Sequence, residues 1–485
     1  MPRTGTKEIP LDQFFAPRRL TLARYFCSRI ILPALGAAAF LGAGCTTSGI
    51  SVAPEDVEAP EAWVRGGDAG EVEAGWLASF SDPTLDALVA ESMVGNRALK
   101  QDRLQLQIAR QAAAVARSSR FPAFDLGLDG SRREFEDEAG DTISVDTYSA
   151  TVSGRFDVDL WGELSKAQQA AELSVAAQEA RVQGAEYSVA GTIAGQYFDV
   201  LEATQLLTLA ESRLENTQAS HDIVASGYRQ GLNDALDLYL ARNQVERERA
   251  SLAQQQQSQR EAMAALQLSL ARYPHGEADF SGELPVLNDP VPTGLPSELL
   301  LRRPDLREAW LNLLAADADL AAAHKARFPQ LLLTGSTGAT SVRLSELLDG
   351  GFSNWSLAFG LTQPLFDAGR LAAIEEQALM RLRIAEEAWL GLVYDAFADV
   401  ENAVSRRASL ETRYEAFLEA EKNSRAALDL ALDQYQRGLV TYTTVLESQR
   451  QAFDAEATVV QLRNQRLQNR LALYLALGGD FDGSQ

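Results

Sequence analysis

The sequence has very little of the chemistry that catalytic and metal sites use. Its 485 residues include two cysteines, Cys27 and Cys45, and three histidines far apart in the chain, His221, His275 and His324. No Gly-rich phosphate loop, nucleophile elbow or metal-ligand spacing is present. Carboxylates are plentiful, but a solvated helix face explains most of them. The sequence therefore predicts no enzymatic activity, no cofactor and no bound metal.

Basic charge is also scarce. The chain carries a net charge of −23, which argues against nucleic-acid binding because that function needs a basic face. The exception is residues 1–44, where six Lys and Arg stand against Glu8 and Asp12. This segment carries +4, so the remaining residues carry −27. A basic leader on an acidic chain indicates a targeting segment.

Long apolar runs are missing as well. No window reaches about 18 uninterrupted apolar residues, so the chain is not expected to span a membrane by helices. The run at 30–41 is too short to span and predicts a signal peptide over 1–44. Residues 41–45, Leu-Gly-Ala-Gly-Cys, resemble a lipoprotein cleavage site at which Cys45 is acylated. The alternative is an ordinary cleaved signal with an incidental cysteine, and Thr46 favours the outer membrane over the inner one.

The chain repeats itself once, at an offset of 207 residues. Arg-Phe-Pro occurs at 120–122 and 327–329, and a Tyr-x-x-Gly-Leu pattern occurs at 228–232 and 435–439. Two copies are too few for a solenoid. A stretch rich in Pro and Gly, 273–303, separates the two halves. Each half is expected to contain a helix, two strands, a long helix and a shorter helix.

Two segments predict unusually long helices. Glu163–Arg229 and Leu371–Arg437 contain no Pro, so each is expected to form one helix of about 100 Å. Gly231 and Gly438 follow these segments and are expected to cap them in the left-handed conformation at a chain reversal. The expected helices are 98–119, 163–229, 234–270, 371–437 and 441–477.

Strict alternation of apolar and polar residues predicts strands. Phe124, Leu126 and Leu128 alternate with polar residues or Gly, and similar patterns cover 150–158, 331–339 and 355–362. Such strands have one apolar face and can cross a membrane as part of a tilted barrel. Four strands cannot close a barrel, and lipid cannot pair their edges, so spanning strands imply an oligomer. Three chains would supply twelve strands. The alternative is a soluble sandwich.

Several motifs together resemble one family, the TolC-like outer-membrane factors. They are the opening segment around Trp76, Phe80 and Asp82-Pro83, and the string Leu-Pro-Ser-Glu-Leu-Leu-Leu-Arg-Arg-Pro-Asp-Leu at 295–306. Gln363–Leu371 and Tyr435–Gln449 are similar to the second strand-to-helix junction and the second hairpin tip. Within the family, the chain most resembles the NodT-type lipoproteins that serve resistance-nodulation-division pumps.

The resemblance implies a mainly α protein with a membrane β-barrel portion. Three chains would form a 12-stranded barrel, four strands per chain, continued by a long periplasmic α-helical barrel. The implied function is a passive outer-membrane channel that conducts drugs or other solutes from an inner-membrane pump and a periplasmic adaptor protein. Outer-membrane lipid is a further implied partner. The expected parts are the signal (1–44), a lipidated and equatorial segment (45–96), the first repeat (97–272), an equatorial linker (273–303), the second repeat (304–478) and a tail (479–485).

The hairpin tips match the family's periplasmic entrance. Gly231 and Gly438 match the tip glycines, while Leu232, Leu439 and Val440 match apolar residues that meet the adaptor. Turn geometry alone is the simpler role for the glycines, and both roles are compatible. The resemblance therefore implies that the functional residues lie at the hairpin tips.

Two carboxylates are gate or selectivity candidates by resemblance. Asp237 falls where the family often places a gate carboxylate, and its counterpart in the second repeat, Thr444, carries no charge. Glu447 falls where an acidic ring narrows the pore in some members. Three such carboxylates around a narrow axis would favour cations. An ordinary solvated Glu is the alternative.

Other expectations concern the loops and the competing functions. Arg133–Asp141 and Ser341–Gly351 join paired strands and are expected to be extracellular loops. One alternative function is a lipid-anchored periplasmic coiled-coil scaffold without a channel. Another keeps the channel but serves an ABC transporter or a heavy-metal pump. Substrate choice is expected to lie mainly in the pump.

Overall fold

The computed structural model describes residues 49–53, 57, 59–60, 62–64, 66, 75–136, 140–232, 234–277, 282–287, 291–294, 296, 299–347 and 352–481. The predicted signal and Cys45 lie outside these residues. The chain divides into the units Met1–Thr46 and Thr47–Gln485, and the second is described below. No helix among the described residues combines the length and apolarity that crossing a membrane requires.

The elements repeat in the order that the duplication predicts. In chain order they are η3 (Trp76–Phe80), α1 (Pro83–Gly95), α2 (Arg97–Ser118), β1 (Ala123–Glu136), β2 (Thr142–Val158), α3 (Glu163–Arg229), α4 (Ala235–Ser269), α5 (Leu299–Arg302), α6 (Pro304–Lys325), β3 (Gln330–Ser341), η5 (Leu344–Glu346), β4 (Phe352–Thr362), α7 (Arg370–Gln436) and α8 (Tyr442–Ala476). The two long and three shorter predicted helices are confirmed to within a residue or two at each end.

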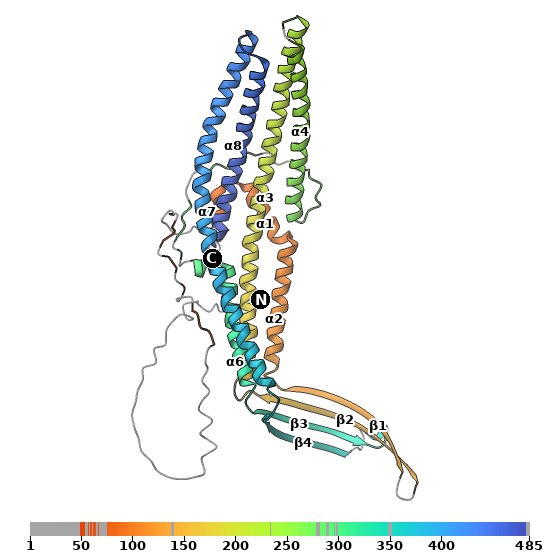
Figure 1. Cartoon of the computed structure of the whole chain (residues 1–485). Coiled ribbons are helices and arrows are strands. Elements are labelled where there is room, and N and C mark those ends of the chain that lie inside the picture. The colour runs from red at the N-terminus through yellow and green to blue at the C-terminus, as the bar shows by residue number, and fades with distance from the viewer. Residues whose placement is uncertain are drawn as a thin grey trace, which may run out of the picture. The chain divides into compact units, whose positions relative to one another are not determined.

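The helices form two long hairpins, α3/α4 and α7/α8, that lie side by side (Figure 1). α3 contacts α2, α4, α6 and α8, whereas α7 contacts α6 and α8. The shorter helices stack end to end. Asn96, between α1 and α2, donates Nδ2 to the carbonyl oxygen of Ser269 at the end of α4 (3.1 Å). Arg303, at the start of α6, donates to the carbonyl oxygen of Ala476 at the end of α8 (3.3 Å). The result is four parallel columns, α4/α2, α3, α8/α6 and α7.

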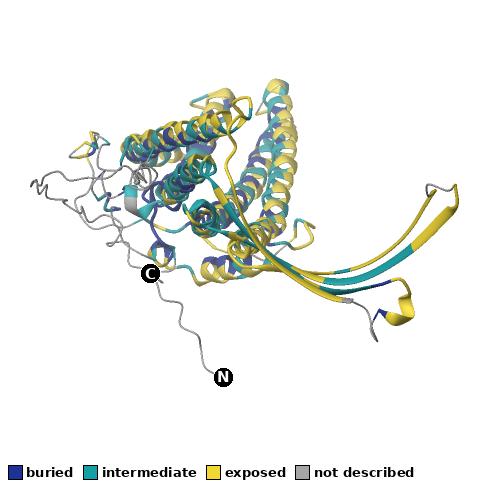
Figure 2. Cartoon of the chain, turned by 90° about the horizontal axis from the view of Figure 1, so that it is seen from below, coloured by how far each residue is buried: buried dark blue, intermediate teal, exposed yellow. Residues whose placement is uncertain are grey.

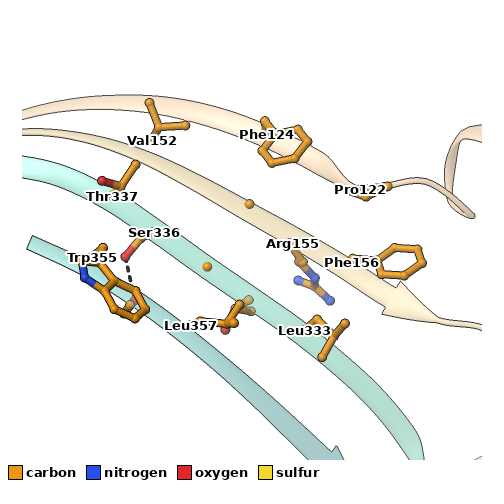
Figure 3. A pocket seen from close by; sticks show the side chains of 14 residues that line it. Pro122, Phe124, Val152, Arg155, Phe156, Leu333, Ser336, Thr337, Trp355 and Leu357 are labelled. Carbon is orange, nitrogen blue, oxygen red and sulfur yellow. Dashed lines mark hydrogen bonds between the residues drawn. The ribbon is translucent and has the colours of Figure 1, made fainter.

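The four strands form one antiparallel sheet in the order β1-β2-β3-β4. The predicted apolar face exists: Phe124, Leu126, Trp355, Leu357 and Phe359 are between 68% and 80% exposed. Figure 3 shows part of this face, with larger side chains such as Phe124 and Trp355 around a hollow. The hollow has a volume of ≈ 500 Å³, and its lining includes Gly154 of β2 and Gly335 of β3. No described residue covers this face, as Figure 2 shows by its exposure.

The main core lies beside the middle of the helices. It joins η3 and α1 to α3, α8 and the linker, and includes Trp76, Phe80, Phe198, Leu201 and Tyr474. Trp76 is 1% exposed and stacks on Tyr474 with ring centroids 5.7 Å apart. The segment around Trp76 and Phe80 is therefore fixed against helices from both repeats.

The predicted loop at Arg133–Asp141 is wrong over its first residues. β1 continues through Glu136, and its pairing with β2 is unbroken from Ala123 to that residue. The strand was missed because apolar and polar residues exchange faces beyond Gly130. In the other predicted loop, Ser341 closes β3, Leu344–Glu346 forms a 3-10 turn, and residues 348–351 lie outside the described residues.

Candidate functional site

The two hairpin tips use the same backbone motif. Gly231 and Gly438 have φ of 73° and 70°, which only glycine adopts without strain. Leu232 N–H bonds to the carbonyl oxygen of Gly227, and Leu439 N–H to that of Gln434, each at 2.9 Å. Each bond closes a six-residue turn and pairs a backbone carbonyl oxygen that would otherwise lack a partner at the end of α3 or α7. The predicted glycine caps are confirmed.

Side chains at the tips differ between the repeats and bring the hairpins together. Tyr435, near the end of α7, donates its hydroxyl to Asp237 Oδ2 in the first turn of α4, at 3.2 Å. Burial, and then the Asp237 charge, raises the pKa of Tyr435, so it is a protonated donor at neutral pH. The equivalent tyrosine of the first repeat, Tyr228, is 44% exposed. Among the described residues, the polar link uses the tyrosine of the second repeat, and Thr444 stands where a carboxylate partner for Tyr228 would be needed.

A small apolar core lies directly behind this link. It takes one or two residues from each of α3, α4, α7 and α8, namely Val224, Ala241, Ala431, Tyr442 and Val445. Tyr442 is 1% exposed, and its hydroxyl has no hydrogen-bond partner among the described residues. Burial, and then the charge of Asp237, raises the pKa of Tyr442 to about 12. At the tips, the two hairpins are thus joined by this small core and the Asp237–Tyr435 bond.

The predicted apolar tip residues are accessible. Leu232 and Leu439 are 76% and 70% exposed, and Val440 is partly buried. Leu236 and Tyr239, on the first turns of α4, are also more than 60% exposed. Exposed apolar residues gathered at one end indicate a protein contact.

Glu447 lies away from the Asp237 link. It is exposed on α8 and forms an ion pair with Arg450 (2.6 Å) and a hydrogen bond with Gln451 (2.8 Å). The bonds from Arg450 and Gln451 hold the pKa of Glu447 below its ordinary value. The carboxylate is therefore ionised, and Arg450 of the same helix, which also pairs with Asp454 (3.4 Å), offsets part of its charge.

Sequence reasoning missed Tyr435 as the hydrogen-bond partner of Asp237, and it missed the buried Tyr442, whose pKa the charge of Asp237 raises. The hydroxyl of Tyr435 and Asp237 are 198 positions apart, so no local pattern connects them. The duplication offered one signal, because a tyrosine precedes the tip glycine in both repeats. The described residues contain no group of three or more His, Cys, Asp or Glu arranged to hold a metal ion. Cys45 is not among the described residues.

Comparison with known proteins agrees with this geometry. The family described as Outer membrane efflux protein matches residues 88–272 and again 295–479, which start 207 residues apart. The cation efflux system protein CusC of Escherichia coli (strain K12) is 31% identical over 413 residues, 84% of this chain and 89% of that protein. The antibiotic efflux pump outer membrane protein ArpC of Pseudomonas putida is 30% identical over 469 residues, 92% and 95% of the two chains.

Solved structures show the same fold. The outer-membrane channel OprN superposes with a TM-score of 0.83 at 26% identity, covering 90% of this chain and 100% of that one. The open state of the Neisseria gonorrhoeae MtrE outer membrane channel gives 0.79 at 27% identity, covering 88% and 98%. The chain thus has the protomer fold of trimeric channels, contributing four strands to a 12-stranded barrel and one third of an α-helical barrel.

These relatives are channels rather than enzymes, and they locate the protein in the outer membrane with its helices in the periplasm. The protein is a passive outer-membrane channel of an efflux system. The scaffold alternative lacks support, since no described residue covers the apolar face of the sheet. By sequence and by structure, the chain belongs to the outer membrane efflux protein family.

Proposed function

We propose that the resting channel is closed at its periplasmic tips by the Asp237–Tyr435 bond, and that a periplasmic adaptor opens it for a resistance-nodulation-division pump. The supporting observation is that the bond joins the two hairpins of one chain at their ends. A hydrogen bond to a charged group contributes about 1.5–3 kcal/mol, enough to shift an open–closed equilibrium more than tenfold. The exposed Leu232 and Leu439 and the partly buried Val440 are the proposed adaptor contacts, with Gly231 and Gly438 fixing the turns that present them.

Each chain has two edges, one on each side, that are suited to contact with neighbouring copies in a homotrimer. Among the described strands, β1 and β4 each pair with a single neighbour. The outer helix columns, α2 and α7, present exposed apolar side chains, among them Leu104, Ile108, Ile384 and Tyr394. In a ring of three copies, each α2/β1 edge would meet the α7/β4 edge of the next copy, which would bury these residues and pair the strands.

Removing the carboxylate at the gate is expected to open it. Asp237→Asn should raise the mean single-channel conductance of the purified trimer in planar bilayers several-fold, because Tyr435 then donates to a neutral acceptor. Tyr435→Phe should act in the same direction. Asp433→Asn is the matched control, since Asp433 pairs with Arg437 at the end of α7 (2.9 Å) and this pair does not link the two hairpins. Its conductance should equal that of the unmodified trimer.

Two results would count against these proposals separately. A conducting trimer unaffected by Asp237→Asn would remove the gate and leave the channel. A trimer without conductance under any tip substitution would challenge the duct itself.

We propose that the three Glu447 carboxylates form only a weakly charged acidic ring around the pore axis. Arg450 pairs with both Glu447 (2.6 Å) and Asp454 (3.4 Å), so Glu447→Gln should remove one negative charge per chain near the axis and reduce the cation-to-anion permeability ratio. Reversal potentials in a salt gradient measure this ratio. An unchanged ratio would assign Glu447 to a solvated face outside the constriction.

The remaining proposals concern the chain ends and the chemistry. We propose that Cys45 is acylated after removal of 1–44 and anchors the channel in outer-membrane lipid, which mass spectrometry of the mature N-terminal peptide tests. The proposed part boundaries are 45–96, 97–272, 273–303, 304–478 and 479–485. No enzymatic activity is proposed, and a turnover that copurified with the trimer and vanished with one polar substitution would contradict this.

A further inference from the structure

The β1–β2 hairpin extends beyond the rest of the sheet (Figure 1). β3 ends where Ser341 pairs with Tyr148, whereas β1 and β2 remain paired as far as Glu136 and Thr142. The extension adds about 20 Å of two-stranded ribbon at roughly 3.3 Å per residue. Because the register contains no bulge from Ala123 onwards, side chains keep alternating between the same two faces.

One face of this ribbon is charged. Even-numbered residues of both strands share the face that carries Phe124 and Val152 in the membrane part of the sheet. On the ribbon this face holds Arg132, whose Nε donates to Ser144 Oγ at 3.0 Å and lies 3.8 Å from Asp146 Oδ1. This face is therefore unsuited to lipid and marks where the apolar belt ends.

The other face of the hairpin changes from polar side chains in the membrane part to apolar side chains on the ribbon. In the membrane part, odd-numbered residues such as Thr151 are polar and face the barrel interior. On the ribbon, Phe135 pairs with Ile143, and Val145 follows opposite Arg133. Phe135, Ile143 and Val145 remain 53%, 38% and 38% exposed. An apolar patch thus continues the inner face of the barrel above the membrane.

We propose that Phe135, Ile143 and Val145 of three copies of this chain pack together across the pore axis as an outer seal at the extracellular mouth. The seal rests on the trimeric channel described above, because a closed barrel directs the inner faces of three ribbons at one axis. The patch is continuous with that assembly, and its charged reverse side keeps it out of lipid. The same patch on the other two copies is therefore the partner that fits it.

An apolar constriction blocks ions by excluding water from the pore. Arg133 lies at the base of the seal on the same face, and its aliphatic stem can cover Val145 while its guanidinium stays in the aqueous lumen. The outer mouth would then have a closure of its own, independent of the periplasmic tips.

Cross-linking tests the packing directly. Ile143→Cys places a thiol on the inner face, and the adjacent Ser144→Cys places one on the outer face. The mature chain offers no other thiol except Cys45. With a short bismaleimide on whole cells, Ile143→Cys should give a covalent dimer within the trimer, and Ser144→Cys should not.

Access to the lumen provides a second readout. Ser153→Cys is a reporter on the polar inner face within the barrel. A large hydrophilic maleimide is added outside intact cells, and the rate at which it labels this cysteine is measured. Adding Phe135→Ser and Ile143→Ser should raise the labelling rate about tenfold or more, because two apolar side chains per copy are lost from the seal. Val145→Ser is the milder variant if the double substitution lowers the amount of trimer.

Equal cross-linking at positions 143 and 144, or an unchanged labelling rate in a heat-stable trimer, would show that the ribbons splay apart and the mouth is open. The channel itself is judged separately, by trimer formation and conductance of the unmodified protein. If the unmodified protein formed no trimer and conducted no ions, the channel itself would be contradicted. If only the cross-link failed to form, the seal alone would be contradicted.

Discussion

Leu357→Arg is expected to remove the trimer from the outer membrane. Leu357 is 77% exposed in the middle of β4, on the apolar face with Trp355 and Phe359. An Arg at the lipid-facing midplane of a barrel costs about 2–4 kcal/mol, or roughly 6–12 kcal/mol for three copies. The heat-stable trimer band in outer-membrane extracts should disappear.

Ala358→Arg is the matched control. Ala358 is the next residue of β4 and lies on the opposite face, which lines the aqueous interior. The trimer should persist with this substitution, because a lumen-facing Arg stays hydrated. Equal loss in both variants would mean that the exposed apolar face is covered by protein instead of lipid.

Trp76→Ala is expected to destabilise the middle of the molecule by about 3–5 kcal/mol per chain, the range for deleting a large buried aromatic. Trp76 stacks on Tyr474 and packs edge-on against Phe80 at 6.2 Å. Its backbone N–H, with that of Gly75, bonds to the carbonyl oxygen of Asp480. The substitution should detach the N-terminal segment from α8 and lower the temperature at which the trimer dissociates.

Trp76→Phe should be much milder. The indole N–H of Trp76 is buried and has no hydrogen-bond partner among the described residues, so the exchange loses volume but no bond. Tyr273→Ala, at an 82% exposed position, should change stability by no more than about 0.5 kcal/mol. A large effect of Trp76→Phe would reveal a partner for the indole in the assembled trimer.

Helices and most strands were predictable because their signals are local. The absence of Pro over Glu163–Arg229 and Leu371–Arg437 predicted α3 and α7 almost residue for residue. Gly231 and Gly438 predicted the reversals, since a left-handed cap needs glycine. Alternation predicted the strands where one face stays apolar, and failed beyond Gly130, where the two faces exchange polarity.

The proposed gate was predictable only in part. The family resemblance pointed to Asp237, but its partner Tyr435 belongs to the other repeat. The same limit applied to Glu447, whose neighbour Arg450 is plain in the sequence but whose ion pair depends on the side-chain geometry of α8.

The sequence by itself determined the local structure of this protein: the duplication, the Pro-free helices, the glycine reversals and the two-faced strands. These follow from backbone preference and from the period of apolar residues, which act within a few turns of chain. Only the tertiary structure decided that Asp237 meets Tyr435, and that β1 and β2 stay paired as far as Glu136, which places Phe135 opposite Ile143. Both depend on how distant segments register against each other, which packing across the whole fold sets and no short pattern encodes.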